Sequence, residues 1–514
     1  MELFYIEVVD ISIVIDLNFN IMSQINDVFS DVLKDITPTG KEIIFIESIT
    51  EKLKKLLDIK AKELNIDYIK IEPQGSTGIK QTQLRNDFDI DLFVGLEYQE
   101  YKSKYENLSK NKLKKESKKD FLDLCNKWII PSLSLKEFKN PRLLYAEHPY
   151  VIVDYHFKDI KIKIDIVLYF NLELELIQKQ GPITSVDRSP WHGRFIRDNL
   201  SSDQKNDVRL LKQFFKSNHS YGDKSSLGKV GFIGYSAELL IYYFNDILNL
   251  FRNFDRLKTD PLDYYNRDKA DLKKIIHFQK EYLIIVDPID KNRNVASAIS
   301  ERAYNYCSYR ISKFLNNPSK TFFEIQPIPE IELNNLREQP LSKIFIVELR
   351  NLDNHIHYTI NRDKLHSLGE NIKATGEIEF THKEKFGNII FEVYFEENRN
   401  EYNIALYCEK PDISETYIRK GPSVKDSFHA ANFKKKNSTF YEKNGYLWVE
   451  TRRDFNDFLV FLQHTINTKI PDNFKVINVA PSINTKTSSG KKTLTILTRM
   501  VLPFYLKNSV SFRN

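Results

Sequence analysis

The stretch GSTGIKQTQLRNDFDIDLF, residues 75–93, joins a glycine–serine turn to three aspartates that occupy every second position of an otherwise apolar run. Side chains in a β-strand alternate between its two faces, so the pattern predicts that Asp87, Asp89 and Asp91 share one face of a strand. Crowding three carboxylates on one face is unfavourable without a cation. The stretch therefore predicts a strand whose polar face binds a cation.

A second strand can supply another carboxylate. In KIKIDIVLYF, residues 161–170, the isoleucines point one way and Lys163 and Asp165 point the other. Acids from two strands, with a glycine–serine turn upstream, suit two Mg²⁺ ions that hold a nucleoside triphosphate, because Mg²⁺ prefers few carboxylates together with phosphate oxygens. One ion then activates an attacking hydroxyl and the other stabilises the leaving pyrophosphate. Each motif alone is common, but their order indicates nucleotidyl transfer.

The bulk properties limit the class of protein. A chain of 514 residues is too long for one ordinary domain, and about three domains are expected. The net charge of +6 permits a polyanionic partner without requiring one. The three cysteines, Cys125, Cys307 and Cys408, lack metal-type spacing, so we expect reduced thiols in a reducing compartment.

The sequence contains no targeting or membrane-spanning segment that we can identify. No apolar run is long enough to span a bilayer. Residues 1–21 contain acidic residues but no Lys or Arg, so they lack the basic flank of a signal peptide. We interpret them as an N-terminal extension or as the product of a misassigned start codon, and we expect the first helix to begin at Met22.

Periodicity places further elements along the chain. Helical periodicity covers residues 42–64, and an alternating strand at 67–73 leads into the turn. Residues 101–120 are rich in Lys and poor in apolar side chains, which favours a solvated helix or loop insertion over a dedicated nucleic-acid contact. Residues 196–316 are mostly helical in pattern, and short alternating runs from about residue 320 predict strands mixed with helices. An α+β multidomain protein is expected.

The order of these motifs resembles that of the polymerase-beta-like nucleotidyltransferases, and longer segments resemble one branch of that superfamily. They include YAEHPYV (145–151), IKIDIV (162–167), TSVDRSPWHGRF (184–195), GFIGYSAELL (231–240), VDPIDKNRNVASAIS (286–300) and GPSVKDSFHAANF (421–433). Each is similar to a segment of the archaeal-type, class I CCA-adding tRNA nucleotidyltransferases. The similarity runs from about residue 22 to at least residue 455.

This resemblance implies an architecture and an activity. The expected fold is a catalytic head with a mixed sheet at residues 22–190, a helical neck at 191–316, and an α+β body and tail that bind tRNA at 317–514. The expected activity is the template-independent addition of C, C and A to the 3′ end of tRNA from CTP and ATP, with release of pyrophosphate, in the cytoplasm. The family often forms homodimers, so a homodimer is also expected.

The resemblance also assigns roles to individual residues. Asp89 and Asp91 would bind Mg²⁺, Asp165 would be the third carboxylate beside the primer hydroxyl, and Asp87 lies outside the family's pair. The implied nucleotide-binding residues are Gly75, Ser76, Lys80, Glu147, His148, Ser189, His192, Lys212, Tyr221 and Arg293. The implied tRNA-binding residues are Lys434, Lys435, Lys436, Arg452 and Arg453.

Other interpretations remain open. The family commonly has an arginine three residues after the serine of the turn, where this chain has Ile79 followed by Lys80, so either Lys80 substitutes through a shifted loop or that phosphate contact is missing. A solvated Lys212, a buried structural His148 and an ion-paired Arg293 are the alternatives from the residues alone. For the whole protein, the alternatives are a poly(A) polymerase or oligoadenylate-type nucleotidyltransferase, and a catalytically silent RNA-binding protein.

Overall fold

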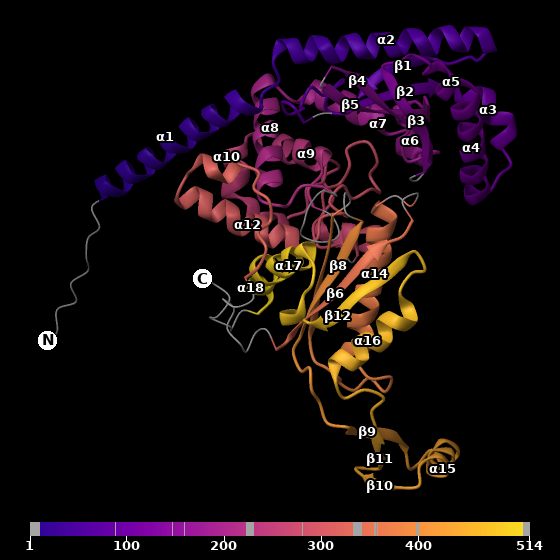
Figure 1. The fold of residues 1–514 in the computed structure, drawn as a ribbon, viewed down its shortest axis with the longest axis vertical. Coiled ribbons are helices and arrows are strands. Elements are labelled where there is room, and N and C mark those ends of the chain that lie inside the picture. Colours follow the sequence, from indigo (N-terminus) through magenta and orange to yellow (C-terminus); the bar gives the residue numbers. More distant parts are fainter. Residues whose placement is uncertain are drawn as a thin grey trace. The chain divides into compact units, whose positions relative to one another are not determined.

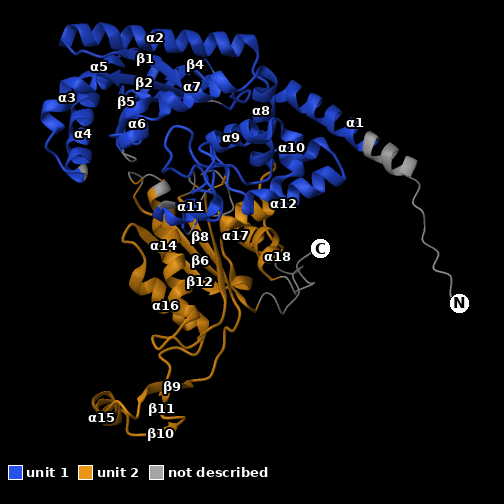
Figure 2. Cartoon of the chain, turned by 180° about the vertical axis from the view of Figure 1, so that it is seen from behind, with its two compact units in different colours: residues 1–222, 232–299, 307–325 blue, residues 223–231, 300–306, 326–514 orange. Residues whose placement is uncertain are grey.

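The computed structural model describes residues 11–506, apart from residues 88, 146–147, 159, 223–230, 280, 333–341, 354–355, 357 and 397–399. The chain divides into two compact units (Figure 2). Unit 1 comprises residues 1–222, 232–299 and 307–325, and unit 2 comprises residues 223–231, 300–306 and 326–514. The expected head and neck fall largely in unit 1, and their separation into two domains stays a prediction.

Unit 1 is built on a five-stranded sheet with the order β1-β2-β5-β4-β3 (Figure 1). Its strands are β1 (Lys70–Gln74), β2 (Ile90–Leu96), β3 (Phe138–Tyr145), β4 (Pro149–Phe157) and β5 (Ile160–Phe170). The central pair β2 and β5 is parallel and the other neighbours are antiparallel, so the prediction of a mixed sheet is confirmed. Parallel pairing places corresponding residues of β2 and β5 side by side.

The strand that carries the aspartates is shorter than predicted. β2 begins at Ile90, after a turn in which Asn86 has a left-handed backbone with φ 57°. Of the three aspartates only Asp91 lies in the strand, and Phe88 lies outside the described residues. The reason is that β1 ends at Gln74, opposite Asp91, so the preceding segment has no partner on that side.

One face of this sheet forms the core of unit 1. Leu92 of β2 and Ile164 of β5 are buried together with Leu53 and Leu57 of α2 (Gly40–Leu64). Burying such a side chain contributes about 1.5–3 kcal/mol. Because strand residues alternate, the neighbouring Asp91 and Asp165 must face the other side of the sheet.

The Lys-rich segment is helical. It forms α3 (Tyr98–Tyr105) and most of α4 (Lys110–Leu124), and α5 (Ile130–Ser132) follows. Phe121 of α4 is buried in the core of unit 1, whereas Lys114 and Lys115 are exposed. Of the two structures predicted for this segment, the solvated helix is the one observed.

The remainder of unit 1 is mainly helical, as predicted. Its helices are α6 (Leu174–Gln180), α7 (Ser189–Asn199), α8 (Ser202–Ser217), α9 (Gly234–Phe244), α10 (Ile247–Arg252), α11 (Lys269–Lys274) and most of α12 (Glu301–Asn316). Helix α1 (Ile11–Ile36) begins before the predicted start at Met22. Phe29 of α1 stacks on Phe314 of α12, with ring centroids 5.7 Å apart, so α1 is part of the packed unit.

Unit 2 contains a four-stranded antiparallel sheet with the order β12-β6-β8-β7. Its strands are β6 (Ile344–Asn351), β7 (Ile389–Glu396), β8 (Glu401–Cys408) and β12 (Phe474–Pro481). Helices α14 (Tyr358–Glu377) and α16 (Phe458–Lys469) pack on one face, and α17 (Ser488–Thr495) and α18 (Leu502–Tyr505) pack on the other. Val347 lies in the first core and Ile346 in the second, as strand alternation predicts.

A second, three-stranded sheet in unit 2 has the order β10-β11-β9. It comprises β9 (Thr416–Ser423), β10 (Phe440–Lys443) and β11 (Tyr446–Arg452), together with helix α15 (Ser427–Lys436). The prediction of strands mixed with helices after residue 320 is confirmed. In the described ranges of the chain, every helix is too short or too polar to cross a membrane.

Candidate active site

The glycine–serine turn lies at the end of β1, directly beside Asp91. Gly75 has φ +67°, which residues with side chains rarely adopt, and a Cβ there would collide with Oδ2 of Asp91. The hydroxyl of Thr77 donates a hydrogen bond to the backbone carbonyl of Asp89 at 2.8 Å. Ser76 lies between these two contacts and is partly exposed. The turn and the acidic segment are therefore held against each other.

Asp91 and Asp165 are register partners on the two parallel strands. Burial, together with the negative charges of Asp165 and Asp89, raises the pKa of Asp91 to about 7. Burial also raises the pKa of Asp165, although Lys163, whose Nζ lies 3.2 Å from Oδ2, opposes this shift. The pair therefore carries more negative charge than the surrounding cations offset.

This pair fits a divalent cation. Oδ1 of Asp165 is buried and has no hydrogen-bond partner among the described atoms, which is unfavourable for a carboxylate without a ligand. Within the described residues, however, no three His, Cys, Asp or Glu side chains lie close enough to hold a metal ion by themselves. Asp89 is exposed and precedes β2. The structure thus places two of the three predicted metal ligands, Asp91 and Asp165, side by side. Asp89 lies outside this pair, and its negative charge contributes to raising the pKa of Asp91.

Asp87 has a different environment from the pair. It is 41% exposed and forms an ion pair with Lys216 of α8. This agrees with its interpretation as a residue that flanks the site.

Lys80 and Lys212 meet at one buried carboxylate. Nζ of Lys80 donates to Oε2 of Glu238 at 2.7 Å, and Nζ of Lys212 lies 3.2 Å from Oε1. The Thr82 hydroxyl donates to Glu238 at 2.7 Å and accepts from Lys212 at 2.8 Å. Burial alone would raise the pKa of Glu238, but the two lysines lower it to about 2. Two cations around one anion leave a net positive charge, which suits a phosphate-binding site.

His192 and Arg293 meet at a second buried carboxylate. Oδ2 of Asp287 lies 2.8 Å from Nε2 of His192 and 2.8 Å from a guanidinium nitrogen of Arg293, and Oδ1 accepts from the Tyr235 hydroxyl at 3.0 Å. Burial would raise the pKa of Asp287, but His192 and Arg293 hold it well below its usual range. Tyr235 stacks on His192 at 4.3 Å, and Nζ of Lys80 lies 4.7 Å from the Tyr235 ring centroid. The two clusters are therefore contiguous.

Two more predicted residues lie at the edges of these clusters. Ser189 is the first residue of α7, the helix that carries His192. A Cβ at Gly234 would lie 3.2 Å from the Tyr221 hydroxyl and 3.5 Å from Nζ of Lys212, so Gly234 lets these groups approach one another. Tyr221 and Lys212 therefore both lie beside Gly234, and their role in nucleotide binding stays a prediction.

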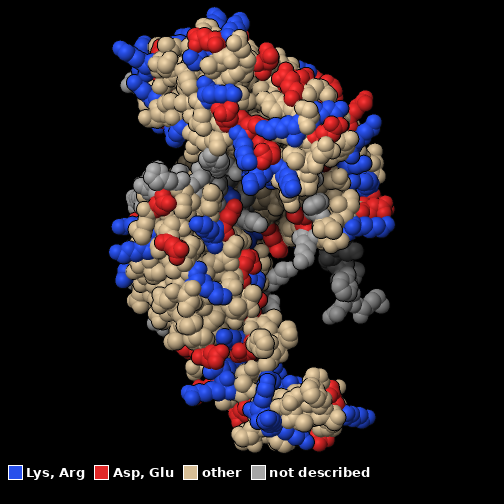
Figure 3. Space-filling view, turned by 90° about the vertical axis from the view of Figure 1, so that its right-hand side faces the viewer, with Lys and Arg blue, Asp and Glu red and all other residues tan. Residues whose placement is uncertain are grey.

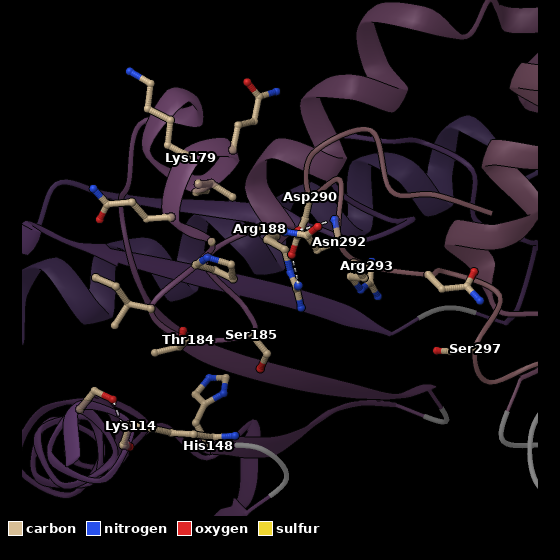
Figure 4. A pocket seen from close by; sticks show the side chains of 18 of the residues that line it. Lys114, His148, Lys179, Thr184, Ser185, Arg188, Asp290, Asn292, Arg293 and Ser297 are labelled. Carbon is tan, nitrogen blue, oxygen red and sulfur yellow. Dashed lines mark hydrogen bonds and ion pairs between the residues drawn. The ribbon is translucent and has the colours of Figure 1, made fainter. Parts of the chain in front are cut away.

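His148 lines a cavity of about 810 Å³ that Arg293 also lines (Figure 4). It is buried, and its ring meets that of Phe121 edge to face at 5.8 Å. His148 therefore packs against Phe121 and also lies on the same cavity as Arg293. Glu147 lies outside the described residues.

Three residues that organise the site were not identified from the sequence: Glu238, Asp287 and Tyr235. The sequence does contain a signal for the two acids, since each stands in or next to an apolar run. An acidic residue in such a run is expected to be buried, and a buried charge requires a partner. Glu238 lies within GYSAELLIYYF, and Asp287 follows LIIV. Glu238 pairs with Lys80, 158 residues away, and Asp287 pairs with His192, 95 residues away. The sequence pattern could therefore indicate that each acid has a partner, but it could not identify that partner.

The predicted tRNA-binding residues divide into two groups. Lys434–Lys436 at the end of α15 and Arg452 at the end of β11 are exposed, and Figure 3 shows basic side chains over this part of unit 2, at the bottom of the view. Arg453 was expected with them, but its side chain is only 8% exposed. It pairs with Glu379 and lies 4.7 Å from the Tyr417 ring centroid, so it holds unit 2 together instead.

Known proteins resemble this chain along most of its length. The family model described as tRNA nucleotidyltransferase, second domain, matches residues 206–324. A CCA-adding enzyme of Saccharolobus islandicus is 30% identical over 425 residues, which cover 82% of this chain and 85% of the relative. A CCA-adding enzyme of Methanococcus maripaludis is 28% identical over 458 residues, which cover 86% and 92%.

Two solved structures show a distant likeness to this chain. A cytoplasmic RNA terminal U-transferase has a TM-score of 0.42 at 14% identity, over 60% of this chain and 100% of its own. CdnC of E. coli MS115-1, in complex with HORMA-deltaN, has a TM-score of 0.40 at 16% identity, over 59% and 93%. Likeness at this level carries no argument about activity. On its sequence relationship to a curated member over 82% of its length, this chain belongs to the CCA-adding enzyme family of tRNA nucleotidyltransferases.

Proposed function

We propose that this chain adds C, C and A in turn to the 3′ end of tRNA, using CTP and ATP without a nucleic-acid template and releasing pyrophosphate. The observation that carries the proposal is the register pair Asp91 and Asp165 beside the glycine–serine turn, in a chain of the CCA-adding enzyme family. Two adjacent carboxylates on a polar strand face can hold the metal ions that nucleotidyl transfer uses.

Mg²⁺ is the cation that we propose for this pair. Asp91 and Asp165, with Asp89 nearby, would hold it, and bound Mg²⁺ would supply charge stabilisation to the attacking hydroxyl and to the leaving pyrophosphate. The unpartnered Oδ1 of Asp165 and the raised pKa of Asp91 both support a cation at this position.

The two buried clusters would bind the nucleotide. Lys80 and Lys212 offer positive charge to the triphosphate, and Ser76 with the backbone N–H groups of its turn can donate to phosphate oxygens. Arg293 presents guanidinium donors that suit the acceptors of cytosine and adenine. Because Asp287 and Glu238 hold these cations before a nucleotide arrives, less side-chain freedom is lost on binding.

For the RNA, we propose that Lys434–Lys436 and Arg452 contact phosphates of the tRNA. Lysine contacts to phosphates release counterions, so tRNA affinity should fall steeply with salt. We further propose that the protein acts in the cytoplasm, which its three free, buried cysteines support, and that it forms a homodimer, which sedimentation would test.

Extension of end-labelled tRNA that lacks its CCA end tests the activity. With CTP, ATP and Mg²⁺, growth by three nucleotides that then stops supports the proposal. A long ladder from ATP alone would instead identify a poly(A) polymerase or an oligoadenylate-type enzyme. If the wild-type protein binds tRNA but incorporates nothing, it is a silent RNA-binding protein.

A further inference from the structure

Helix α4 brings basic side chains to the cavity that His148 and Arg293 share. The cavity of about 810 Å³ is lined by His148 and by three segments of unit 1: α4, residues 177–188 and residues 281–297 (Figure 4). Its basic lining residues are Lys114, Lys118, Lys179, Arg188 and Arg293, and its acidic ones are Glu281 and Asp290. The cavity therefore has an excess of positive charge.

Two of these cations already have acidic partners. Arg188 lies 2.8 Å from Asp290, and Arg293 lies 2.8 Å from Asp287. Among the described side chains, no acid forms an ion pair with Lys114 or Lys118. The uncompensated charge of the cavity thus lies mainly on its α4 side.

The sequence of α4 explains why these two lysines face the cavity. Lys114 and Lys118 are four residues apart, so they lie on the same face of the helix. The buried residues Ser117 and Phe121 form the adjacent face that packs on unit 1. Figure 4 shows Lys114 extending from α4 toward His148. Lysines on the remaining faces of α4 do not line this cavity, so the two that do are a specific pair.

We propose that this cavity binds the single-stranded 3′ end of the tRNA and that Lys114 and Lys118 contact its phosphates. The inference rests on the proposed function and names the part of the protein that holds the strand being extended. Opposite the lysines, Ser185, Asn292 and Ser297 offer uncharged donors and acceptors. Single-stranded RNA is recognised by this combination of phosphate charge and hydrogen bonds to base edges and 2′-hydroxyls.

A free nucleotide does not account for the α4 lysines. Lys80 and Lys212, the residues proposed for the triphosphate, do not line this cavity, whereas Arg293, proposed for the base, does. A nucleotide with its base at Arg293 and its triphosphate at Lys212 therefore has no further phosphate to offer α4. A neighbouring RNA strand, in contrast, carries phosphates that the α4 lysines can contact.

Charge removal on α4 tests the proposal. We expect the double variant Lys114→Ala/Lys118→Ala to bind tRNA ending in CC roughly 25-fold more weakly at 0.1 M salt, about fivefold for each contact. Its plot of log affinity against log salt should be shallower by about 1.4, since each single-strand phosphate contact contributes about 0.7. The matched control is Lys112→Ala/Lys115→Ala, which removes the same charge from exposed positions of the same helix outside the cavity and should bind like wild type.

A second RNA localises the contact. tRNA trimmed to leave no unpaired 3′ nucleotide should bind wild type and Lys114→Ala/Lys118→Ala equally. The proposal is overturned if the difference persists with the trimmed tRNA, if the control variant shows the same loss, or if the variant raises KM for CTP and ATP while tRNA affinity is unchanged. Thermal unfolding verifies that both variants fold.

Wild-type extension measured in parallel separates this inference from the proposed function. If wild type completes CCA but the variant binds tRNA normally, only the cavity assignment is wrong. If wild type incorporates nothing, the proposed activity fails, and the binding comparison still decides whether the cavity holds RNA.

Discussion

Unit 1 contains two pairs of carboxylates, one partly buried and one fully buried, that differ in the charge around them. On the polar face of β2 and β5, Asp91 lies opposite Asp165, and the only cation recorded at hydrogen-bonding distance from either, within the described residues, is Lys163. Around α9, Glu238 has two lysines as partners and Asp287 has Arg293 and His192. Burial raises the pKa of Asp91 to about 7, whereas Lys80 and Lys212 lower the pKa of Glu238 to about 2.

The difference shows which part of the site is complete without ligands. Glu238 and Asp287 are satisfied by the chain itself, so they can hold their cations in place before a nucleotide binds. Asp91 and Asp165 are not satisfied, because like charges are adjacent and one oxygen of Asp165 has no partner among the described atoms. Such a pair is stabilised when it takes up a proton or binds a cation, which agrees with the proposed metal site.

The largest expected effect comes from removing a carboxylate of the unsatisfied pair. Asp91→Ala should lower CTP incorporation by about 10³-fold, because it removes several kcal/mol of transition-state charge stabilisation. tRNA affinity should be nearly unchanged, and the fold should be retained, because a like-charge contact is relieved. The matched control is Asp87→Ala, which removes an exposed aspartate outside the pair and should keep most of the activity. Equal losses in both variants would contradict the assignment.

Removing a carboxylate that is already paired with cations should mainly lower the free energy of unfolding. Asp287→Ala leaves Arg293 and His192 without their shared partner and should lower the free energy of unfolding by about 3–5 kcal/mol. Denaturant unfolding measures this. Asp290→Ala, which breaks the less buried ion pair with Arg188, is the control and should cost less. A larger loss in the control would show that Asp287 does not organise the cluster.

A more conservative substitution in the cluster around Glu238 should lower the free energy of unfolding by less than Asp287→Ala does. Glu238→Gln keeps the shape of the side chain but removes the charge between Lys80 and Lys212, and it should destabilise the protein by about 1.5–3 kcal/mol. We expect KM for CTP and ATP to rise as well, because the two lysines repel each other and lose their positions. Glu238→Gln/Lys212→Met restores the balance of charge and should recover stability but not KM. Failure to recover stability would argue against charge pairing as the cause.

Stability should also depend on pH with opposite sign in the two regions. The pKa of Asp91 is raised from 3.8 to about 7, so the native state holds a proton that the unfolded chain releases, and this group lowers the free energy of unfolding as pH rises from about 4 to about 7. The pKa of Glu238 is lowered from 4.5 to about 2, so its contribution is lost as pH falls from about 4.5 to about 2.

Unfolding without Mg²⁺ at several pH values measures both slopes. Asp91→Asn should lack the decline between pH 4 and 7, and Glu238→Gln should lack the loss below pH 4.5. Added Mg²⁺ should reduce the decline in wild type only. Profiles that coincide for wild type and Asp91→Asn would show that this carboxylate is not held in a raised-pKa environment.

Local pattern was sufficient to predict much of the fold. The alternation of residues 161–170 predicted β5 and the face on which Asp165 lies, and the helical periodicity of residues 42–64 matches α2. Local pattern did not predict the ends of strands and helices whose boundaries depend on a distant partner. The aspartate strand begins at Ile90 because β1 ends opposite Asp91. Helix α1 begins at Ile11 rather than Met22.

Contacts with distant residues also explain what the sequence did not show about the site. Arg453 looked like a surface arginine, since nothing in LWVETRRDF distinguishes it from Arg452. The structure buries it against Glu379, 74 residues earlier in the chain. Lys80 and Lys212 were predicted as nucleotide-binding residues, and their common partner Glu238 was not foreseen.

The sequence by itself determined the family, the alternation that places Asp91 and Asp165 on the polar faces of their strands, and the residue types that a nucleotidyltransferase site needs. These depend on the chain's local periodicity and on motifs read within a few residues. Only the tertiary structure decided which charges meet: Asp91 with Asp165 across a parallel pair, and Lys80 with Glu238 across 158 residues. The physical reason is that a carboxylate's ionisation depends on burial and on neighbours within a few ångströms, which the folded chain alone brings together.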